Sequence, residues 1–226
     1  MTKGATNYLI DAIEVLRANV TPLFLLGLIG LLFYVRSSGE LSGFALFLPV
    51  IVLFIVYPLI YGRYTEIIQG NTEASYSQIF NKHWFNFFVV SIVVGSPVLL
   101  VTFLGFLLGK HVVATKTLLS LLIDVLSIYI FPLVFLLRER VSCISLGIKC
   151  LLGNFKFSIP LVVLTLMPSI LGLLIRNPST TSDERITAFF TNYFFWLFGI
   201  FFDFVIFIAS ALILKEKLSI TNKNQG

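Results

Sequence analysis

Long apolar stretches, separated by short polar connections, form the dominant pattern along the chain. A helix that crosses a bilayer needs about 20 mostly apolar residues. Most of the stretches reach or approach that length, and the first is shorter. They cover residues 20–35, 43–61, 84–109, 117–137, 157–175 and 186–214. The pattern predicts an all-α integral membrane protein with six transmembrane helices.

Strands are the alternative for a chain so rich in Phe and Val. A membrane barrel alternates apolar and polar positions in segments of about ten residues. The stretches of this chain are longer than that and are apolar on all sides. Helices therefore fit the pattern better than strands.

A short amphipathic segment precedes each helix that would run outward through the membrane. These segments cover residues 8–19, 76–86 and 141–154, and each ends in an asparagine: Asn19, Asn86 or Asn154. Such a helix rests at the membrane interface with its apolar side in the acyl boundary. The asparagine would lie where the chain turns into the membrane and would cap the following helix.

The first of these segments shows the amphipathic pattern best. One helical face gathers its apolar side chains, which are Tyr8, Leu9, Ala12, Ile13 and Leu16. Asp11 and Glu14 lie on another face. The spacing predicts a cytoplasmic interfacial helix.

The inward-running helices end in charged residues, which completes a repeating unit. Arg63 and Glu66 follow the second apolar stretch, and Arg138 and Glu139 follow the fourth. The last stretch ends in Lys215-Glu216-Lys217. The unit would be an interfacial helix, a helix out, a helix back and a charged exit. Three such hairpin repeats, at about 5–62, 63–140 and 141–217, would form a single membrane domain over residues 1–226, with a pseudo-axis along the membrane normal.

Lysine and arginine are unevenly divided between the two sides of the predicted membrane. Positive residues near helix ends favour the cytoplasm. The smaller set comprises Arg36, Lys110, Lys116, Arg176 and Arg185, and the remaining Lys and Arg lie on the side of the termini. The distribution predicts that the N- and C-termini are both cytoplasmic.

Composition supports the membrane interpretation. Hydrophobic residues make up 58% of the 226 residues and charged residues 12%, whereas a soluble domain carries about 25% charged residues. This excludes a soluble globular enzyme, a disordered chain and a disulfide scaffold. The net charge of +5 reflects the orientation of the chain in the membrane and its contact with anionic lipid. The sequence contains no basic stripe with interleaved aromatic residues, and it therefore predicts no nucleic-acid partner.

Several local patterns carry a resemblance to a known family. One is the amphipathic helix that ends in Asn, and another is the segment 70–80, which precedes the third apolar stretch. The last is the segment 131–140, which is followed by Gly147 and by Gly153-Asn154. The chain resembles the six-span bacterial membrane domain found fused to glycerophosphodiester phosphodiesterases, and its stand-alone relatives. The resemblance implies a six-helix fold in the cytoplasmic (inner) membrane of a bacterium. It implies no catalytic residue, because the fused phosphodiesterase carries the chemistry in those proteins.

Two acidic residues interrupt the apolar stretches and form a candidate intramembrane polar site. Asp203 would lie roughly 16 Å from the cytoplasmic end of its helix, and Asp124 roughly 10 Å from the outer end of its own. A carboxylate exposed to lipid costs several kcal/mol, so both should face the interior of the bundle. They would form a proton or cation site or a substrate anchor. Alternatively, each is a protonated acid that bonds to a neighbouring polar group.

Other polar residues give weaker indications. Cys143, Cys150 and His83 fall on the predicted cytoplasmic side, but nothing fixes the tetrahedral spacing of a zinc site. Glu66 with Gln69-Gly70 also fits the coupling helix of small exporter permeases, although the threefold repeat argues against that class. The sequence predicts no catalytic residue, no metal site and no cofactor.

Two classes of function remain open from sequence. The first is a non-enzymatic accessory or membrane-homeostasis component that acts through membrane lipids, a membrane-protein partner or a homo-oligomer. The second is a small transporter or lipid translocator that uses Asp203. Prolines inside the apolar stretches suit the second class, since they break helices that line a path, but membrane helices also tolerate proline for packing alone.

Overall fold

The structure is a computed structural model that describes residues 4–20, 22–24, 26–27, 44–107, 113–175 and 182–223. Helices form all of its regular elements, and no strand occurs in these residues, which confirms the all-α prediction. The helices are α1 (Ala5–Ala18), α3 (Phe44–Gln69), α4 (Tyr76–Leu107), α5 (Val113–Ser127), α6 (Ile130–Leu137), α7 (Ser142–Gly153), α8 (Phe155–Ile175) and α9 (Ser182–Lys223).

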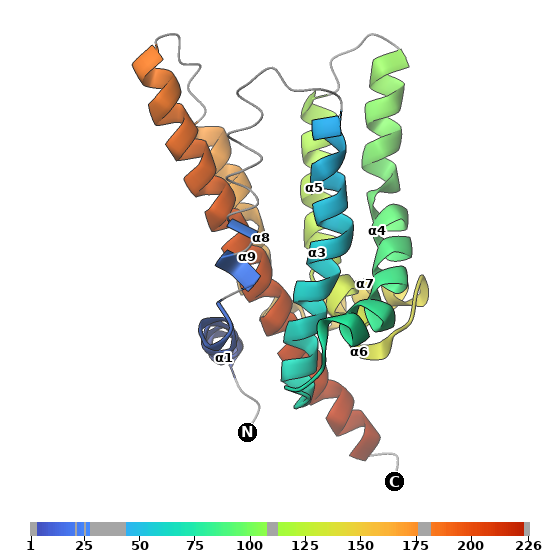
Figure 1. The fold of residues 1–226 in the computed structure, drawn as a ribbon. Coiled ribbons are helices and arrows are strands. Elements are labelled where there is room, and N and C mark those ends of the chain that lie inside the picture. The colour runs from blue at the N-terminus through green and yellow to red at the C-terminus, as the bar shows by residue number, and fades with distance from the viewer. Residues whose placement is uncertain are drawn as a thin grey trace.

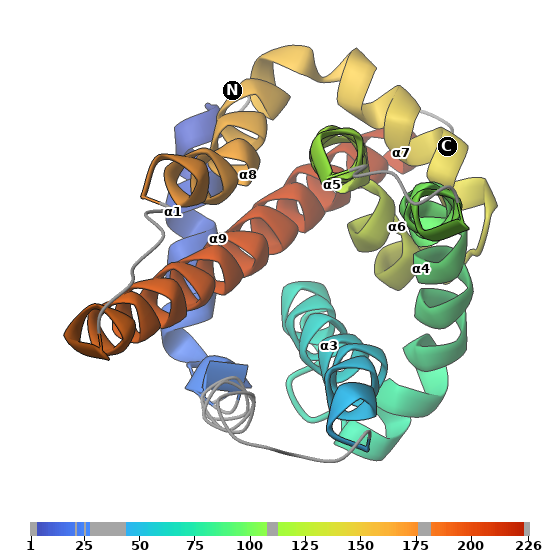
Figure 2. The same ribbon diagram turned by 90° about the horizontal axis from the view of Figure 1, so that it is seen from above.

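The long helices run side by side, and short helices lie across one end. Figure 1 shows α3, the upper part of α4, and α5 standing upright beside the tilted α9, while α1 and α7 lie crosswise below. The end of α9 reaches the same lower end as α1. Figure 2 shows α9 passing diagonally through the middle of the ring formed by the other helices. The crosswise helices thus gather at one end of the molecule.

Several helices have the length and apolarity to cross a membrane. Within the described residues, Tyr76–Leu107 and Leu197–Lys217 each qualify alone. Two bent pairs, Ala114–Ser127 with Ile130–Leu137 at 40° and Ser142–Gly153 with Phe155–Pro168 at 107°, raise the number to four if each is one span. The first predicted stretch, 20–35, lies largely outside the described residues.

The helix ends differ from the sequence prediction at one of the three asparagines. Asn19 and Asn154 each terminate a helix with non-helical backbone angles, φ −138° and ψ 57° for Asn19 and φ −115° and ψ 31° for Asn154. Asn86 instead lies within α4, which continues through it and curves from a crosswise to an upright course (Figure 2). The expected helix break at Asn86 is therefore wrong.

The side-chain bonds of these asparagines explain the difference. An asparagine disturbs a helix mainly when its amide competes for nearby backbone groups. The side chain of Asn19 donates to the carbonyl oxygen of Val15 in its own helix, at 3.2 Å. The amide of Asn86 bonds instead to the segment after α6, through Arg138 and Arg140. With its amide engaged there, Asn86 leaves the ladder of α4 intact.

The sharp bend between α7 and α8 is held by bonds around Asn154. Its carbonyl oxygen accepts the backbone N–H groups of Phe157 and Ser158, at 2.9 and 3.0 Å. The Ser158 hydroxyl donates to the same carbonyl oxygen at 2.9 Å. The amide of Phe157 is one of those that the start of a helix leaves without a partner, and the bond to Asn154 satisfies it. The backbone of Asn154, rather than its side chain, thus caps α8.

The crosswise helix α1 packs on the end of α9. Tyr8, Ala12 and Leu16 are buried, as the sequence predicts for one face. Ile13, expected on that face, is instead 44% exposed, because the contact follows a narrow stripe with a spacing of four residues. The Tyr8 hydroxyl donates to Glu216 Oε2 at 2.6 Å, which ties the two ends of the chain together.

An aromatic cluster fills the core between α3, α6 and α9. The ring of Tyr61 stacks on that of Phe207 with centroids 4.2 Å apart, and the ring of Phe135 lies 5.9 Å from Tyr61. Phe204 and Phe135 are completely buried. Two of its rings, those of Tyr61 and Phe207, also line a cavity.

Candidate functional site

A cavity of about 450 Å³ lies among the long helices above the aromatic cluster. Residues from α3, α4, α5, α6, α8 and α9 line it. Both intramembrane acids are among them, Asp124 on α5 and Asp203 on α9. The two carboxylates, which lie far apart in the sequence, therefore face one space.

Each acid is exposed to the cavity rather than packed against protein. Asp124 and Asp203 are both exposed, whereas Phe204, the residue after Asp203, is completely buried. Within the described residues, no hydrogen-bond donor reaches either carboxyl group. The described part of the chain therefore holds no hydrogen bond of the kind that would mark either residue as a packed, protonated acid.

Hydroxyl groups supplement the carboxylates. Ser91 and Ser127 line the cavity, and their buried Oγ atoms have no hydrogen-bond partner in the described part of the chain. Thr165 also lines it, but its hydroxyl donates to the carbonyl oxygen of Leu161 at 2.8 Å. A buried hydroxyl without a partner costs free energy. The two serines are thus placed to bond to whatever fills the cavity.

Apolar groups form the rest of the wall. The lower part is aromatic and includes Tyr61, Phe131 and Phe207. Pro132 and Pro168 are also lining residues. Pro132 lies in the first turn of α6, directly after the break between α5 and α6, whereas Pro168 lies inside α8. The prolines thus contribute directly to the cavity.

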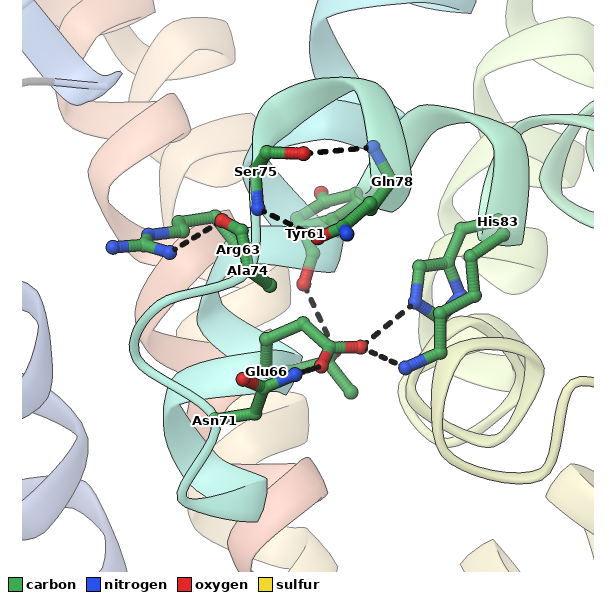
Figure 3. A network of polar contacts seen from close by, with 10 residues as sticks. Tyr61, Arg63, Glu66, Asn71, Ala74, Ser75, Gln78 and His83 are labelled. Carbon is green, nitrogen blue, oxygen red and sulfur yellow. Dashed lines mark hydrogen bonds and ion pairs between the residues drawn. The ribbon is translucent and has the colours of Figure 1, made fainter.

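A second polar group lies at the lower end of α3, around Glu66 (Figure 3). The Glu66 side chain is 2% exposed and pairs with Lys82 of α4. Asn71 Nδ2 donates to Glu66 Oε2 at 2.8 Å, and His83 Nε2 lies 3.4 Å from Oε1. The neighbouring Arg63 donates to the carbonyl oxygen of Ala74 at 3.0 Å. Together they fix the turn between α3 and α4.

The charge of Glu66 is held by these bonds. Burial alone would raise the pKa of its carboxyl group, but hydrogen bonds from Lys82, Asn71 and His83 outweigh that effect and keep the pKa below its ordinary value. The His83 ring also packs against Phe135, with centroids 5.0 Å apart. Since Phe135 belongs to the aromatic cluster, the Glu66 group lies on the opposite side of this cluster from the cavity.

The second charged exit contacts the same helix. Asn86 Nδ2 donates to the carbonyl oxygen of Arg138 at 2.9 Å, and Arg140 Nε donates to Asn86 Oδ1 at 3.0 Å. Arg138 adopts a left-handed conformation with φ 58°, which ends α6. Glu139 accepts a hydrogen bond of 2.6 Å from Ser142 at the start of α7. The first part of α4 therefore joins both exits.

The other residues that the sequence singles out, Asn19, Cys143 and Cys150, belong to the packing of the helices. The carbonyl oxygen of Asn19 accepts the Tyr64 hydroxyl at 2.8 Å. Cys143 is buried and Cys150 partly buried, both as free thiols. In the described residues, no three His, Cys, Asp or Glu side chains gather as a metal site.

Sequence reasoning identified the acids but missed their neutral neighbours. Ser127 lies three residues after Asp124, Gly199 four before Asp203, and Gly95 four after Ser91. Residues three or four apart share a helix face. Pairs of small or polar residues at this spacing within apolar stretches were therefore the available signal.

Comparisons with known proteins supply no further assignment. Nothing matches this chain among family models, curated proteins or solved structures.

Proposed function

We propose that the chain is a non-enzymatic, six-span protein of a bacterial cytoplasmic membrane that binds a solute in the carboxylate cavity and transports it or passes it between leaflets. The observation that carries this proposal is that Asp124 and Asp203 line one cavity. Ionisable groups within a bilayer are costly and generally serve a function. Two of them facing one open space favour ligand binding over packing.

The contacts at the lower end support three hairpins closed into a ring. A glutamate lies near the lower end of each inward-running helix or just after it, and each accepts a hydrogen bond from a crosswise segment. Glu66 accepts from Lys82, Glu139 from Ser142, and Glu216 from Tyr8. In the first two cases the partner lies in the next segment along the chain. In the third it lies in α1, which closes the cycle.

The gathering of α1 and α7 at one end supports a shared membrane orientation (Figure 1). Exposed Ile10 and Ile13 of α1 suit the acyl boundary. With the excess of Lys and Arg, this end would face the cytoplasm and anionic lipid. Both termini would then be cytoplasmic.

Thiol labelling in intact membranes tests whether the cavity is open to water. Cys143 and Cys150 are first replaced by alanine. Asp203→Cys is then compared with Phe204→Cys, which lies at nearly the same depth but is completely buried. A membrane-impermeant methanethiosulfonate should label position 203 and spare position 204. Equal labelling, or labelling of 203 only after unfolding, would contradict an open binding cavity.

The accessory function is the second candidate, and one observation favours it. The outer face of α4 exposes large apolar side chains, including Leu99, Phe103 and Phe106, which suit lipid or another membrane protein. Native mass spectrometry of the chain, purified in mild detergent, distinguishes the candidates. A stoichiometric second protein or second copy would favour the accessory function, and a lone chain with a bound solute would favour transport.

A further inference from the structure

We infer that the cavity selects an organic cation that carries an ammonium group and an apolar tail. This inference rests on the proposed function and names its ligand class. It combines the charge of the cavity, its size, its unpartnered hydroxyl groups and the placement of its aromatic wall.

The charge of the cavity favours a cation. Asp124 and Asp203 are its acidic groups, and none of the described lining residues is Lys, Arg or His. No internal counter-charge therefore neutralises the two carboxylates. A bound cation would supply it between the helices, where the attraction is stronger than in bulk water.

The size and composition of the wall argue against a bare calcium or magnesium ion. Calcium takes about six to eight oxygen ligands at 2.3–2.6 Å, and magnesium requires a tight octahedron. Two carboxylates and a few hydroxyl groups in about 450 Å³ do not provide such a cage. The volume suits a small organic molecule, whose apolar part would also pack against the long apolar part of the wall.

Ser127 provides an observation independent of the acids. Its side chain belongs to a residue only 8% exposed, lines the cavity, and has no hydrogen-bond partner in the described structure. An ammonium N–H group can donate to this hydroxyl oxygen while its charge pairs with Asp124 one turn away. The unpartnered hydroxyl thus marks where the head group would bind.

The aromatic wall defines the other end of the ligand. In Figure 1, α9 runs downward, and so do α5 and α6. Phe207 therefore lies one turn below Asp203 on α9, and Phe131 lies about two turns below Asp124 along α5 and α6. Tyr61 stacks on Phe207. Aromatic faces attract cations and bury apolar groups. A ligand with an ammonium group above and an apolar tail below matches this order.

Calorimetry with three matched compounds tests the inference on the full chain in nanodiscs at neutral pH. The compounds are 3-phenylpropylamine, 3-phenylpropanol and 3-phenylpropionate, which differ mainly in charge. The amine should bind about tenfold or more tightly than the alcohol, and the carboxylate should not bind. No binding of the amine, equal affinities, or preference for the carboxylate would overturn the inference.

Variants locate the binding. Asp203→Asn and Asp124→Asn should each weaken amine affinity about tenfold, and Ser127→Ala should weaken it by less. Glu14→Gln removes a carboxylate from the exposed surface of α1 and should change nothing. Asp203→Glu should retain most of the affinity, which guards against a folding defect. Wild-type affinity in both asparagine variants would overturn the assignment.

The outcome is separable from that of the labelling experiment. If position 203 is labelled but the amine does not bind, the cavity is open and its ligand is not an organic cation. If position 203 is not labelled, the proposed function itself fails.

Discussion

Glu66 shows how a buried carboxylate is tolerated at the end of an apolar helix. Its side chain is 2% exposed, whereas that of its partner Lys82 is 23% exposed. The two partners therefore differ in what happens when one is removed. Lys82 alone can turn to water, but Glu66 alone would keep a buried charge supported only by its contacts with Asn71 and His83.

This asymmetry predicts that Lys82→Met destabilises the fold more than Glu66→Gln. Removal of one partner from a buried pair costs about 3–5 kcal/mol, and the lysine variant should approach that range. Glutamine can still accept the bond from Asn71. The thermal unfolding midpoints of the two variants are compared in detergent, with unfolding monitored by the reactivity of the buried Cys143 thiol. Equal midpoints for the two variants would show that the pair does not hold Glu66.

The same carboxylate predicts an acid dependence of stability. Its folded-state pKa is lower than its ordinary value of 4.5, so the unfolded chain takes up the proton first as pH falls. The stabilisation is complete above about pH 4.5 and is lost as pH falls through the lower folded value. The midpoint difference between wild type and Glu66→Gln should therefore shrink below pH 4.5. A difference that stays constant down to pH 3 would contradict this assignment.

At the scale of elements, two glycines allow helices to approach closely. A Cβ atom on Gly147 of α7 would lie 2.6 Å from Ile130 Cγ1 and 2.9 Å from the backbone nitrogen of Ile130. On Gly62 of α3 it would clash with Ile79 Cγ2. Because the Gly147 contact involves backbone atoms, a small side-chain movement cannot relieve it.

Gly147→Ala should therefore destabilise the chain by about 1–3 kcal/mol, the usual cost of overpacking. Gly153→Ala is the matched control at the end of the same helix, because a Cβ atom there meets nothing within 4 Å. Thermal midpoints of both variants provide the measurement. If Gly147→Ala melts with the wild type, the close packing of α7 on α6 is not present in the membrane.

The sequence indicated most helices but not how each one ends. Apolar runs long enough to span a bilayer forced helices, because backbone groups there must bond internally. The course of α4 through Asn86 depended on bonds to Arg138 and Arg140, which are remote in sequence. Ile13 was misplaced for a similar reason, since the width of the buried stripe on α1 is set by α9.

The same distinction holds for the candidate site. Asp124 and Asp203 stood out because an acid in an apolar stretch is rare. That they line one cavity depended on the packing of six helices, for which one sequence holds no signal. The sequence gives no reason to single out Ser127, because a lone serine in a membrane helix ordinarily bonds to its own backbone. Ser210, for example, donates to the carbonyl oxygen of Ile206.

At the scale of the whole molecule, two polar regions lie on either side of the aromatic cluster. The carboxylate cavity opens above it, and the Glu66 group lies below. Tyr61 lines the cavity, and Phe135 contacts both Tyr61 and His83. On the proposed function, this cluster is the barrier between the ligand and the cytoplasmic end.

The shared cavity is the central claim, and thiol cross-linking in native membranes tests it most directly. In a chain without Cys143 and Cys150, the double variant Asp124→Cys/Asp203→Cys is treated with a short bifunctional thiol reagent. Mass spectrometry then detects the joined α5 and α9 peptides. The control pairs Asp203→Cys with Leu122→Cys, because Leu122 is 55% exposed and does not line the cavity. We expect cross-linking between positions 124 and 203 and little between 122 and 203; absence of the first, or equal yields, would contradict the account.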